Sequence, residues 1–535
     1  MTPFTVLIVD NDDTVLVQAK GAFARSANVL VFTADSVESA RAIIKKNFLH
    51  VAFVDMHLRD EQSKNVDGKL VLRELAARRP SCKRFLLTKY VRGYEEHLFN
   101  FFHPLACLVD GAIYKLDFRD SWTSVVERMA EDWTNRTVTI EGLDTVFSEL
   151  QKTGSPSSSL ITSEEIYYEL VELLKGSAAS RTPGPEEIDG ISLEPVVGGR
   201  SRSFVTIGRP VSREDDMGIW CVIKFGPAAE IHEEFIRYSR YVRLLVAVNR
   251  RVELLGYVPG DTTGLICYSF AGSTPDSITS LEQIFRTEND GAFDLLNVLL
   301  DPEQKDWYGE TRQAMDLGQF FSATYSLDPP AILDVMHDFV EKVSQELGGR
   351  VHGSKCIFGN SSLLFPDKTL GTGQMRGEYT SCIVHGDMNA ANVIVSDDGR
   401  VILIDYRHTQ RGPVALDFAA LEGSVRINTL PQDASPRAVI EEINCERTTW
   451  GKSWANRRTK DDNRVFRHLP YWAKVSYRIA GLARLNFPKL RKEEYALTCL
   501  LWGLRLFRVE SLPNTARLRL FVWISQLSTA LSTAK

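Results

Sequence analysis

Two sets of polar residues, one toward each end of the chain, combine residue types that handle phosphate groups. The first set is Asp10, Asp12, Asp55, Thr88 and Lys115. The second set is His385-Gly386-Asp387, Asn392 and Asp405. Carboxylate and amide oxygens can ligate Mg2+, a hydroxyl can donate to a phosphate oxygen, and a lysine can neutralise its charge. The first set therefore predicts a site that receives a phosphoryl group, and the second a site that transfers one from a nucleotide.

Short apolar segments that alternate with helix-like segments would position the first set. The predicted buried strands are residues 5–9, 29–32, 51–54, 84–87 and 112–114, and the predicted helices are 13–24, 37–48, 68–77 and 92–102. This alternation predicts a doubly wound α/β domain with a five-stranded parallel sheet over residues 1–132. Ligands of such sheets bind beyond the carboxyl ends of the strands, where four members of the first set follow separate strands.

The order of these residues resembles the receiver domain of two-component response regulators over residues 4–132. The resemblance implies that Asp55 is the phospho-acceptor, that Asp10, Asp12 and Asp55 hold Mg2+, and that Thr88 and Lys115 contact the phosphoryl group. It also implies a separate histidine kinase or other phosphodonor upstream. The sequence departs from the family pattern at Asn11, where a second acidic residue is usual, and at Ala112, where the family has an aromatic switch residue.

Residues 133–187 contain two stretches rich in Gly, Ser and Pro on either side of one helical pattern, Thr162 to Leu174. Such a composition is typical of a connecting segment. We predict a linker that carries one helix.

A further domain is predicted from residue 188 onward. Gly198 and Gly199 lie between two strand-like segments, where backbone N–H groups can approach nucleotide phosphates. Lys224 follows on a strand with a buried pattern, and its charge there needs an anion such as ATP. The next helical segment carries three possible partners for the lysine, Glu230, Glu233 and Glu234. Glu234 is preferred, although the sequence does not exclude Glu233.

The second polar set lies on a predicted hairpin. Asp398-Gly399 between two apolar segments is a strong hairpin signal, and the hairpin would bring Asn392 near Asp405. Both residues could then ligate Mg2+ bound to nucleotide phosphates. Asp387, which precedes the asparagine by five positions, could face an acceptor hydroxyl as a base or an orienting group. His385 is expected to brace this loop.

Residues 188–525 resemble the aminoglycoside phosphotransferase and choline-kinase-like branch of the protein-kinase fold, through H-G-D-x4-N and the distal Ile404-Asp405. The resemblance implies a two-lobed α+β domain, with an N-lobe at 188–275 and a helical C-lobe at 276–535, that uses Mg2+ and ATP. It also implies that Asp417 supports the catalytic loop. Arg407 replaces the glycine of the D-F-G motif of protein kinases.

Composition and charge limit the kinds of partner that the chain can have. The chain has 535 residues, 44% of them hydrophobic, with a net charge of -6 and eight cysteines that form no C-x-x-C pair, so neither a zinc cage nor a disulfide framework is indicated. Residues 447–535 hold 18 Lys/Arg and 5 Asp/Glu, which opposes a polycationic acceptor and favours an anionic or neutral one. We find no leader-like segment, apolar membrane span or DNA-binding motif, and expect a cytoplasmic protein with no membrane or nucleic-acid partner.

These features predict a two-component signalling protein in which a phosphorylatable receiver regulates an ATP-dependent phosphotransferase. The main alternative is a receiver joined to a nucleotide-binding pseudokinase that recruits partners. A weaker alternative is a nucleic-acid binder that uses the basic C-terminal helices.

Overall fold

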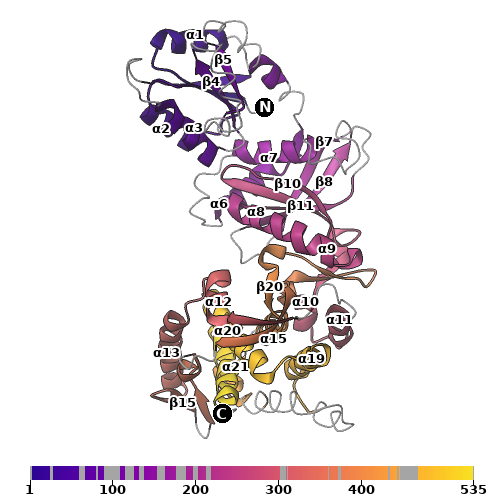
Figure 1. Ribbon diagram of the computed structural model, residues 1–535. Coiled ribbons are helices and arrows are strands. Elements are labelled where there is room, and N and C mark those ends of the chain that lie inside the picture. Colours follow the sequence, from indigo (N-terminus) through magenta and orange to yellow (C-terminus); the bar gives the residue numbers. More distant parts are fainter. Residues whose placement is uncertain are drawn as a thin grey trace. The chain divides into compact units, whose positions relative to one another are not determined.

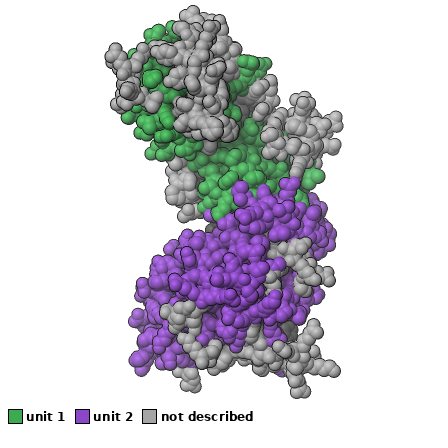
Figure 2. Space-filling view, viewed as in Figure 1, with its two compact units in different colours: residues 1–235, 253–270 green, residues 236–252, 271–535 purple. Residues whose placement is uncertain are grey.

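The computed structural model describes residues 3–23, 28–58, 67–79, 82–88, 109–114, 126–131, 138–152, 163–175, 188–196, 203–212, 218–301, 309, 311–358, 361–370, 375–431, 434–442, 445 and 468–533. The chain divides into two compact units (Figure 2). Unit 1 comprises residues 1–235 and 253–270, and unit 2 comprises residues 236–252 and 271–535. Each unit is described by itself.

Unit 1 begins with the five-stranded parallel sheet that the sequence predicts. Its strands are β1 (Phe4–Val9), β2 (Val29–Ala34), β3 (Val51–Asp55), β4 (Lys83–Thr88) and β5 (Gly111–Tyr114), in the order β2-β1-β3-β4-β5. Every residue of β1 and β3 is buried, as expected for central strands of a sheet with both faces covered. The prediction of a buried parallel sheet is confirmed.

Helices α1 (Asp13–Phe23), α2 (Val37–Lys46) and α3 (Asp67–Arg78) cover the two faces of this sheet (Figure 1). Val6 and Ile8 of β1 belong to the same apolar cluster as Phe23 of α1. Leu7 and Val9, which point the other way, belong to a second cluster with residues of α2 and α3. The doubly wound arrangement is therefore confirmed, while the predicted helix at 92–102 lies outside the described residues.

The second part of unit 1 is a six-stranded sheet in the order β10-β11-β9-β8-β7-β6. Its strands are β6 (Thr139–Glu141), β7 (Ile188–Pro195), β8 (Phe204–Ser212), β9 (Cys221–Pro227), β10 (Leu254–Val258) and β11 (Thr263–Ser269), and its helices are α6 (Leu143–Lys152), α7 (Ser163–Lys175) and α8 (Ala228–Arg237). The six-stranded sheet and the five-stranded sheet belong to one compact unit, although the sequence assigned them to separate domains.

The interpretation of residues 133–187 as a linker with one helix is wrong for the part that the structure describes. β6 pairs in parallel with β7 and so extends the six-stranded sheet, and the segment forms two helices instead of one. Ile166, Leu170 and Val171 of α7 are fully buried in the core of unit 1. The Gly- and Ser-rich stretches themselves lie outside the described residues.

A buried cluster of charged residues joins the end of α3 to α7 and to the turn between β10 and β11. The Nη1 atom of Arg79 lies 3.7 Å from Glu165 Oε2 and 3.8 Å from Asp261 Oδ2. Glu165 Oε1 also accepts the backbone N–H groups of Thr262 and Thr263, at 2.6 and 3.1 Å. Among the described residues, the carboxyl group of Glu169 also lies close to those of Glu165 and Asp261.

Unit 2 contains three small antiparallel sheets and a group of long helices. The sheets are β12-β18-β19, β13-β17-β20 and β14-β15-β16, built from β12 (Ile278–Ser280), β13 (Thr311–Asp316), β14 (Arg350–His352), β15 (Lys355–Phe358), β16 (Ser361–Leu364), β17 (Arg376–Val384), β18 (Val393–Ser396), β19 (Val401–Leu403) and β20 (Gln410–Pro413). The short helical turns are η4 (Tyr238–Val242), α9 (Arg243–Leu245), η5 (Val248–Arg250), η6 (Pro275–Ser277), η7 (Ala390–Asn392) and η8 (Tyr406–His408).

The helices of unit 2 are α10 (Leu281–Arg286), α11 (Ala292–Leu299), α12 (Leu317–Tyr325), α13 (Pro329–Glu346), α14 (Asp367–Leu370), α15 (Ala415–Asn428), α16 (Pro436–Glu441), α19 (Tyr471–Asn486), α20 (Lys492–Phe507) and α21 (Asn514–Thr533). The last three confirm the predicted helical C-terminal segment. α15 is buried from Ala415 to Arg426, and α19, α20 and α21 all pack against it.

Arginines of the basic C-terminal segment lie partly inside unit 2. Arg519 of α21 is 2% exposed and forms an ion pair with Glu442, with Nε 2.7 Å from Oε2. Arg491 pairs with the buried Glu494. Carboxylates within unit 2 thus offset part of the positive charge of this segment. The net charge counted from the sequence is therefore larger than the charge on the surface. In the described ranges, no helix has both the length and the apolar composition needed to cross a membrane.

Glu169 provides a test of the buried cluster. No described residue donates a hydrogen bond to either of its carboxyl oxygens, and burial, with Glu165 and Asp261 nearby, raises its pKa well above the ordinary value. In the folded protein Glu169 is therefore expected to stay protonated to a higher pH than in the unfolded chain. As the pH rises above the unfolded pKa, the unfolded chain ionises and the folded chain does not, so stability falls by up to about 1.4 kcal/mol per pH unit.

We predict that Glu169→Gln removes this loss, because glutamine does not ionise. The gain in the free energy of unfolding relative to wild type should increase between about pH 5 and pH 7, measured by denaturant unfolding of the full chain. Glu172→Gln, a partly exposed position on the same helix, is the matched control. A gain that is equal at both pH values would show that Glu169 is already ionised in the folded protein.

Candidate functional site

Asp10 and Asp55 lie side by side at the carboxyl end of the five-stranded sheet. Asp10 directly follows β1 and Asp55 ends β3, and these strands pair with Val9 opposite Val54. Both carboxylates are buried. Burial of two like charges is costly unless a cation offsets them, and carboxylate oxygens are the ligands that Mg2+ prefers. The two residues therefore fit the predicted magnesium site.

Asp12 has a different surrounding from the other two carboxylates. Its side chain is exposed, and its Oδ1 accepts the backbone N–H of Thr14 at 2.9 Å, as an N-terminal cap of α1 does. Its own N–H donates to Asp10 Oδ1 at 3.0 Å. In the described part of the chain, no group of three or more Asp, Glu, His or Cys side chains is arranged to hold a metal. Metal ligation by Asp12 stays a prediction.

The backbone of the predicted phospho-acceptor is in close contact with the start of α3. Gly68 donates its N–H to the carbonyl oxygen of Met56 at 3.1 Å, and a Cβ atom at position 68 would lie 2.0 Å from the carbonyl oxygen of Asp55. Only glycine fits there. Thr88 ends β4 as predicted, and Lys115 lies outside the described residues. The contacts of these two residues with a phosphoryl group stay predictions.

Lys224 and Glu234 form a buried ion pair in unit 1. Lys224 is on β9 and Glu234 is on α8, with 2.7 Å between Nζ and Oε2. The Tyr268 hydroxyl of β11 donates to the other carboxylate oxygen of Glu234 at 2.9 Å. Glu233 is exposed, so the preferred partner of the lysine is confirmed. The predicted glycine turn at Gly198 and Gly199 lies outside the described residues, and nucleotide binding by these four residues stays a prediction.

The predicted hairpin in unit 2 is confirmed. β18 and β19 pair with Val393 opposite Leu403, and the N–H of Ile404 donates to the carbonyl oxygen of Asn392 at 3.1 Å. Asn392 and Asp405 therefore lie at the open end of one hairpin. The Asn392 amide nitrogen donates to the Asp387 carbonyl oxygen at 2.9 Å, which leaves the amide oxygen as the atom able to ligate a cation.

Asp405 has backbone angles of φ 63 and ψ 74, in the left-handed region. Non-glycine residues adopt this conformation rarely, and it is concentrated at functional sites. Asn392 and Asp405 supply two oxygen ligands of the kind that Mg2+ accepts, so they fit the predicted metal site.

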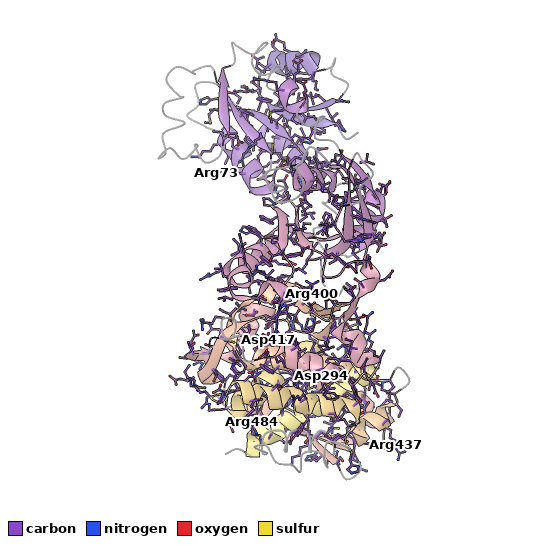
Figure 3. The ribbon with its side chains drawn as sticks, turned by 90° about the vertical axis from the view of Figure 1, so that its right-hand side faces the viewer. Arg73, Asp294, Arg400, Asp417, Arg437 and Arg484 are labelled. Atoms are coloured by element: carbon purple, nitrogen blue, oxygen red, sulfur yellow. The ribbon has the colours of Figure 1, made fainter. Side chains whose placement is uncertain are left out.

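The backbone of the loop before Asp387 is held by the buried carboxylate of Asp417. The N–H groups of His385 and Gly386 each donate to one oxygen of Asp417 at 2.9 Å. Asp417 lies in the interior of unit 2 (Figure 3), and burial raises its pKa while His385 and the two N–H groups act to lower it. His385 Nε2 is 3.0 Å from the Ile404 carbonyl oxygen. The predicted supporting contacts of Asp417 and His385 are present.

The sequence did not identify the side chains that surround Asp387. Arg505 of α20 places Nη1 3.1 Å from Asp387 Oδ1. Its guanidinium carbon lies over two aromatic rings, 4.5 Å from the centroid of Tyr325 and 4.2 Å from that of Trp502. Burial acts to raise the pKa of Asp387, but the charge and the hydrogen bond of Arg505 oppose burial, and the pKa is lowered. Asp387 is therefore ionised at neutral pH and can accept a hydrogen bond.

No local signal could have pointed to Arg505. It is the one arginine within α20, it stands at no fixed spacing from the H-G-D motif, and 118 positions separate it from Asp387. His408 is close to Asp405 in the sequence, and burial lowers its pKa to about 4, so it is neutral beside the loop.

Comparisons with known proteins match separate parts of the chain. The family model described as Ternary complex associated domain 9 matches residues 361–444, less than half of the chain. This segment contains Asp387, Asn392, Asp405 and Asp417. No curated protein matches the chain.

Solved structures are similar to the N-terminal quarter of the chain. A CheY-like response regulator receiver domain protein from Methanospirillum hungatei is 21% identical, covers 25% of this chain and 100% of its own, and has a TM-score of 0.21. Response regulator TrrA from Thermotoga maritima, in complex with Mg2+ and BeF, is 18% identical over 23% of this chain and 97% of its own, with a TM-score of 0.20. The receiver domain of NtrX from Brucella abortus is 22% identical over 24% and 98%, with a TM-score of 0.20.

Gly386 tests the geometry of the loop. Its φ is +79, and a Cβ atom there would lie 2.2 Å from the carbonyl oxygen of His408. We predict that Gly386→Ala reduces the free energy of unfolding of unit 2 by more than about 3 kcal/mol, because left-handed strain adds to a clash between backbone atoms.

Gly399→Ala is the matched control, since Gly399 has φ +80 and no atom near the added methyl group. It should cost only about 1 kcal/mol, the strain of the left-handed backbone. Denaturant unfolding of the full chain measures both changes. Equal losses for the two variants would contradict the close packing of residues 386 and 408.

Proposed function

We propose that this chain is a two-component signalling protein in which a receiver domain at residues 1–132 regulates an ATP-dependent phosphotransferase that acts on a hydroxyl acceptor. The observation that carries the phosphotransferase is in unit 2. Asp417 fixes the backbone that presents Asp387, while Asn392 and Asp405 lie together at the open end of the next hairpin. This combination offers one carboxylate for an acceptor and two oxygen ligands for a metal.

In the proposed reaction, Asp387 accepts a hydrogen bond from the acceptor hydroxyl and orients it toward the γ-phosphorus of ATP. The acceptor oxygen forms a bond to phosphorus, the bond from phosphorus to the β–γ bridging oxygen breaks, the hydroxyl proton passes to Asp387, and ADP leaves. Asn392 and Asp405 would hold Mg2+, which neutralises charge on the nucleotide phosphates.

The ion pair in unit 1 supports nucleotide binding. A lysine on a strand, held by a glutamate on the following helix, is the arrangement with which kinase folds contact ATP phosphates. Lys224 and Glu234 have it, and the Tyr268 hydroxyl satisfies the second carboxylate oxygen. Lys224 would therefore contact the phosphates, while Gly198 and Gly199 would supply backbone N–H groups.

The receiver function rests on the paired carboxylates of unit 1. Asp10 and Asp55 are buried neighbours at the carboxyl end of the parallel sheet, where phosphorylation of Asp55 with Mg2+ at Asp10 is chemically reasonable. Thr88 and Lys115 would contact the phosphoryl group. The phosphate would come from a separate histidine kinase or another phosphodonor.

Helix α3 offers a route from the acceptor to the rest of unit 1. Its first turn packs on the Asp55 and Met56 backbone, and Arg79 directly after its last residue is held by Glu165 and Asp261. A shift of α3 on phosphorylation would therefore change the position of α7 and of the turn between β10 and β11.

One observation favours a second candidate function, a nucleotide-binding module that recruits partners without transfer. Arg505 already forms an ion pair with Asp387, whereas a catalytic base at this position must also bond to the acceptor hydroxyl. If Arg505 stays bonded to Asp387 and keeps the acceptor away, the protein would bind ATP without transferring a phosphoryl group.

The first test measures transfer or release of labelled γ-phosphate from Mg-ATP. We expect turnover by wild type, loss of at least about 100-fold in Asp387→Asn, and a change in rate when beryllofluoride mimics phosphorylated Asp55. Asp55→Asn should turn over ATP without responding to beryllofluoride. ATP binding with no turnover in any of these proteins would support the nucleotide-binding module, and a response that persists in Asp55→Asn would refute the receiver.

A second test concerns transmission through Arg79. Arg79→Met removes the buried guanidinium group that lies near Glu165 and Asp261, so we expect a loss of about 3–5 kcal/mol in the stability of unit 1 and no effect of beryllofluoride on turnover. Arg78→Met is the matched control, because Arg78 is half exposed and pairs with Glu74 within α3. A folded Arg79→Met protein with the full wild-type response would rule out this route.

A further inference from the structure

The environment of Asp387 restricts which acceptors can approach it. Asp387 Oδ1 is occupied by Arg505, and its Oδ2 accepts no hydrogen bond from a described residue. An acceptor hydroxyl would therefore meet Oδ2, with the guanidinium group on the neighbouring oxygen. Any other group of the acceptor close to its hydroxyl must be compatible with that positive charge.

Arg505 is held in place while most of its hydrogen-bond donors remain unused by the described residues. Among contacts with the described residues, its one hydrogen bond uses Nη1, whereas guanidinium has five N–H donors. The side chain is 20% exposed, so part of it can be reached from solvent. The guanidinium group packs against the rings of Tyr325 and Trp502, both of which are buried, and this packing limits its movement. A planar fork that is already ordered binds a carboxylate or phosphate at little further entropic cost.

Tyr325, one of the two rings that pack on Arg505, is hydrogen-bonded to the loop that carries Asp387. The Tyr325 hydroxyl donates to the carbonyl oxygen of Gly386, the residue before Asp387. Arg508, which directly follows α20, donates to the carbonyl oxygens of Tyr325 and Ser326. The guanidinium group of Arg505 and the carboxylate of Asp387 are therefore positioned by one connected set of contacts, which suits a binding site better than a single surface ion pair.

We propose that Arg505 binds the acceptor directly and that the acceptor is a small molecule with an anionic group, a carboxylate or a phosphate, next to the hydroxyl that receives the phosphoryl group. This inference rests on the proposed phosphotransferase function. The anion occupies the donors of Arg505 that face away from Asp387, and the hydroxyl bonds to Oδ2. A polycationic acceptor is excluded from the same position by repulsion from the guanidinium group.

The test compares small hydroxyl compounds that differ in charge. The probes are glycerol, glycerate, glycerol 3-phosphate and ethanolamine, and their binding to the full chain is measured by calorimetry with Mg2+ and a non-hydrolysable ATP analogue. Glycerate or glycerol 3-phosphate, the two anion types, should bind at least about 10-fold more tightly than glycerol and ethanolamine, as expected for a charge-assisted hydrogen bond.

The preference for anions should be lost in Arg505→Gln and partly kept in Arg505→Lys, which retains the charge but not the planar fork. Arg478→Gln is the matched control, because Arg478 belongs to the same basic segment and is bonded to Asn297 instead of Asp387. It removes the same charge and should keep the preference. A merely structural role of Arg505 would weaken binding of all probes alike.

The inference is overturned if wild type binds no anionic probe, binds glycerol equally well, or keeps its preference in Arg505→Gln. Binding of the probes requires no turnover, so these results are separate from failure of the proposed function. That failure would appear as absence of ATP-analogue binding or of labelled phosphate transfer to any probe. Transfer to glycerate or glycerol 3-phosphate identifies which of the two anions the site uses.

Discussion

The contact on which the candidate site depends is the acceptance of two backbone N–H groups by one buried carboxylate. Asp417 binds the N–H groups of His385 and Gly386, and thereby fixes the direction in which the chain leaves β17. A buried carboxylate is costly unless hydrogen bonds satisfy it, and here both oxygens are satisfied by the loop that they position. The loop and α15 therefore stabilise each other, and the loop carries Asp387 to its contact with Arg505 of α20.

Two groups of buried charged residues in unit 1 offset the free-energy cost of burying charge in different ways. Lys224 and Glu234 are at hydrogen-bonding distance and balance in charge, so the pair can remain ionised. Arg79 lies more than 3.5 Å from each of two carboxylates, and a third carboxyl group is close by. Buried carboxyl groups so close to one another favour protonation, and burial raises the pKa of Glu169 well above its ordinary value. Burial raises the pKa of Glu165 to about 7, within the range of cellular pH.

Local signals in the sequence were enough to predict the elements that carry the sites. The sheet of residues 4–114, the hairpin around Asp398-Gly399 and the pairing of Lys224 with Glu234 follow from short apolar segments, a turn dipeptide and helical spacing. The strand β6 and the contacts of Arg79 and Arg505 were not predictable, because each depends on partners distant in the sequence. β6 has three residues and takes its place only by pairing with β7. Sequence patterns encode an element's own periodicity, and they contain no information on which distant side chain will face it.

The basic C-terminal segment shows why net charge is a weak guide to partners. Arg519 and Arg491 are paired with glutamates, and Arg508 donates to carbonyl oxygens, so much of the positive charge serves the packing of α20 and α21. Arg505 differs from these because its carboxylate partner is Asp387, the proposed catalytic base. An arginine binds a ligand only where its remaining hydrogen-bond donors are accessible to that ligand, and the tertiary structure decides where this is so. The balance of 18 Lys/Arg against 5 Asp/Glu therefore does not show which charge a ligand would meet, whereas the hydrogen bond from Arg505 to the proposed base Asp387 marks a position where a charge would act on one.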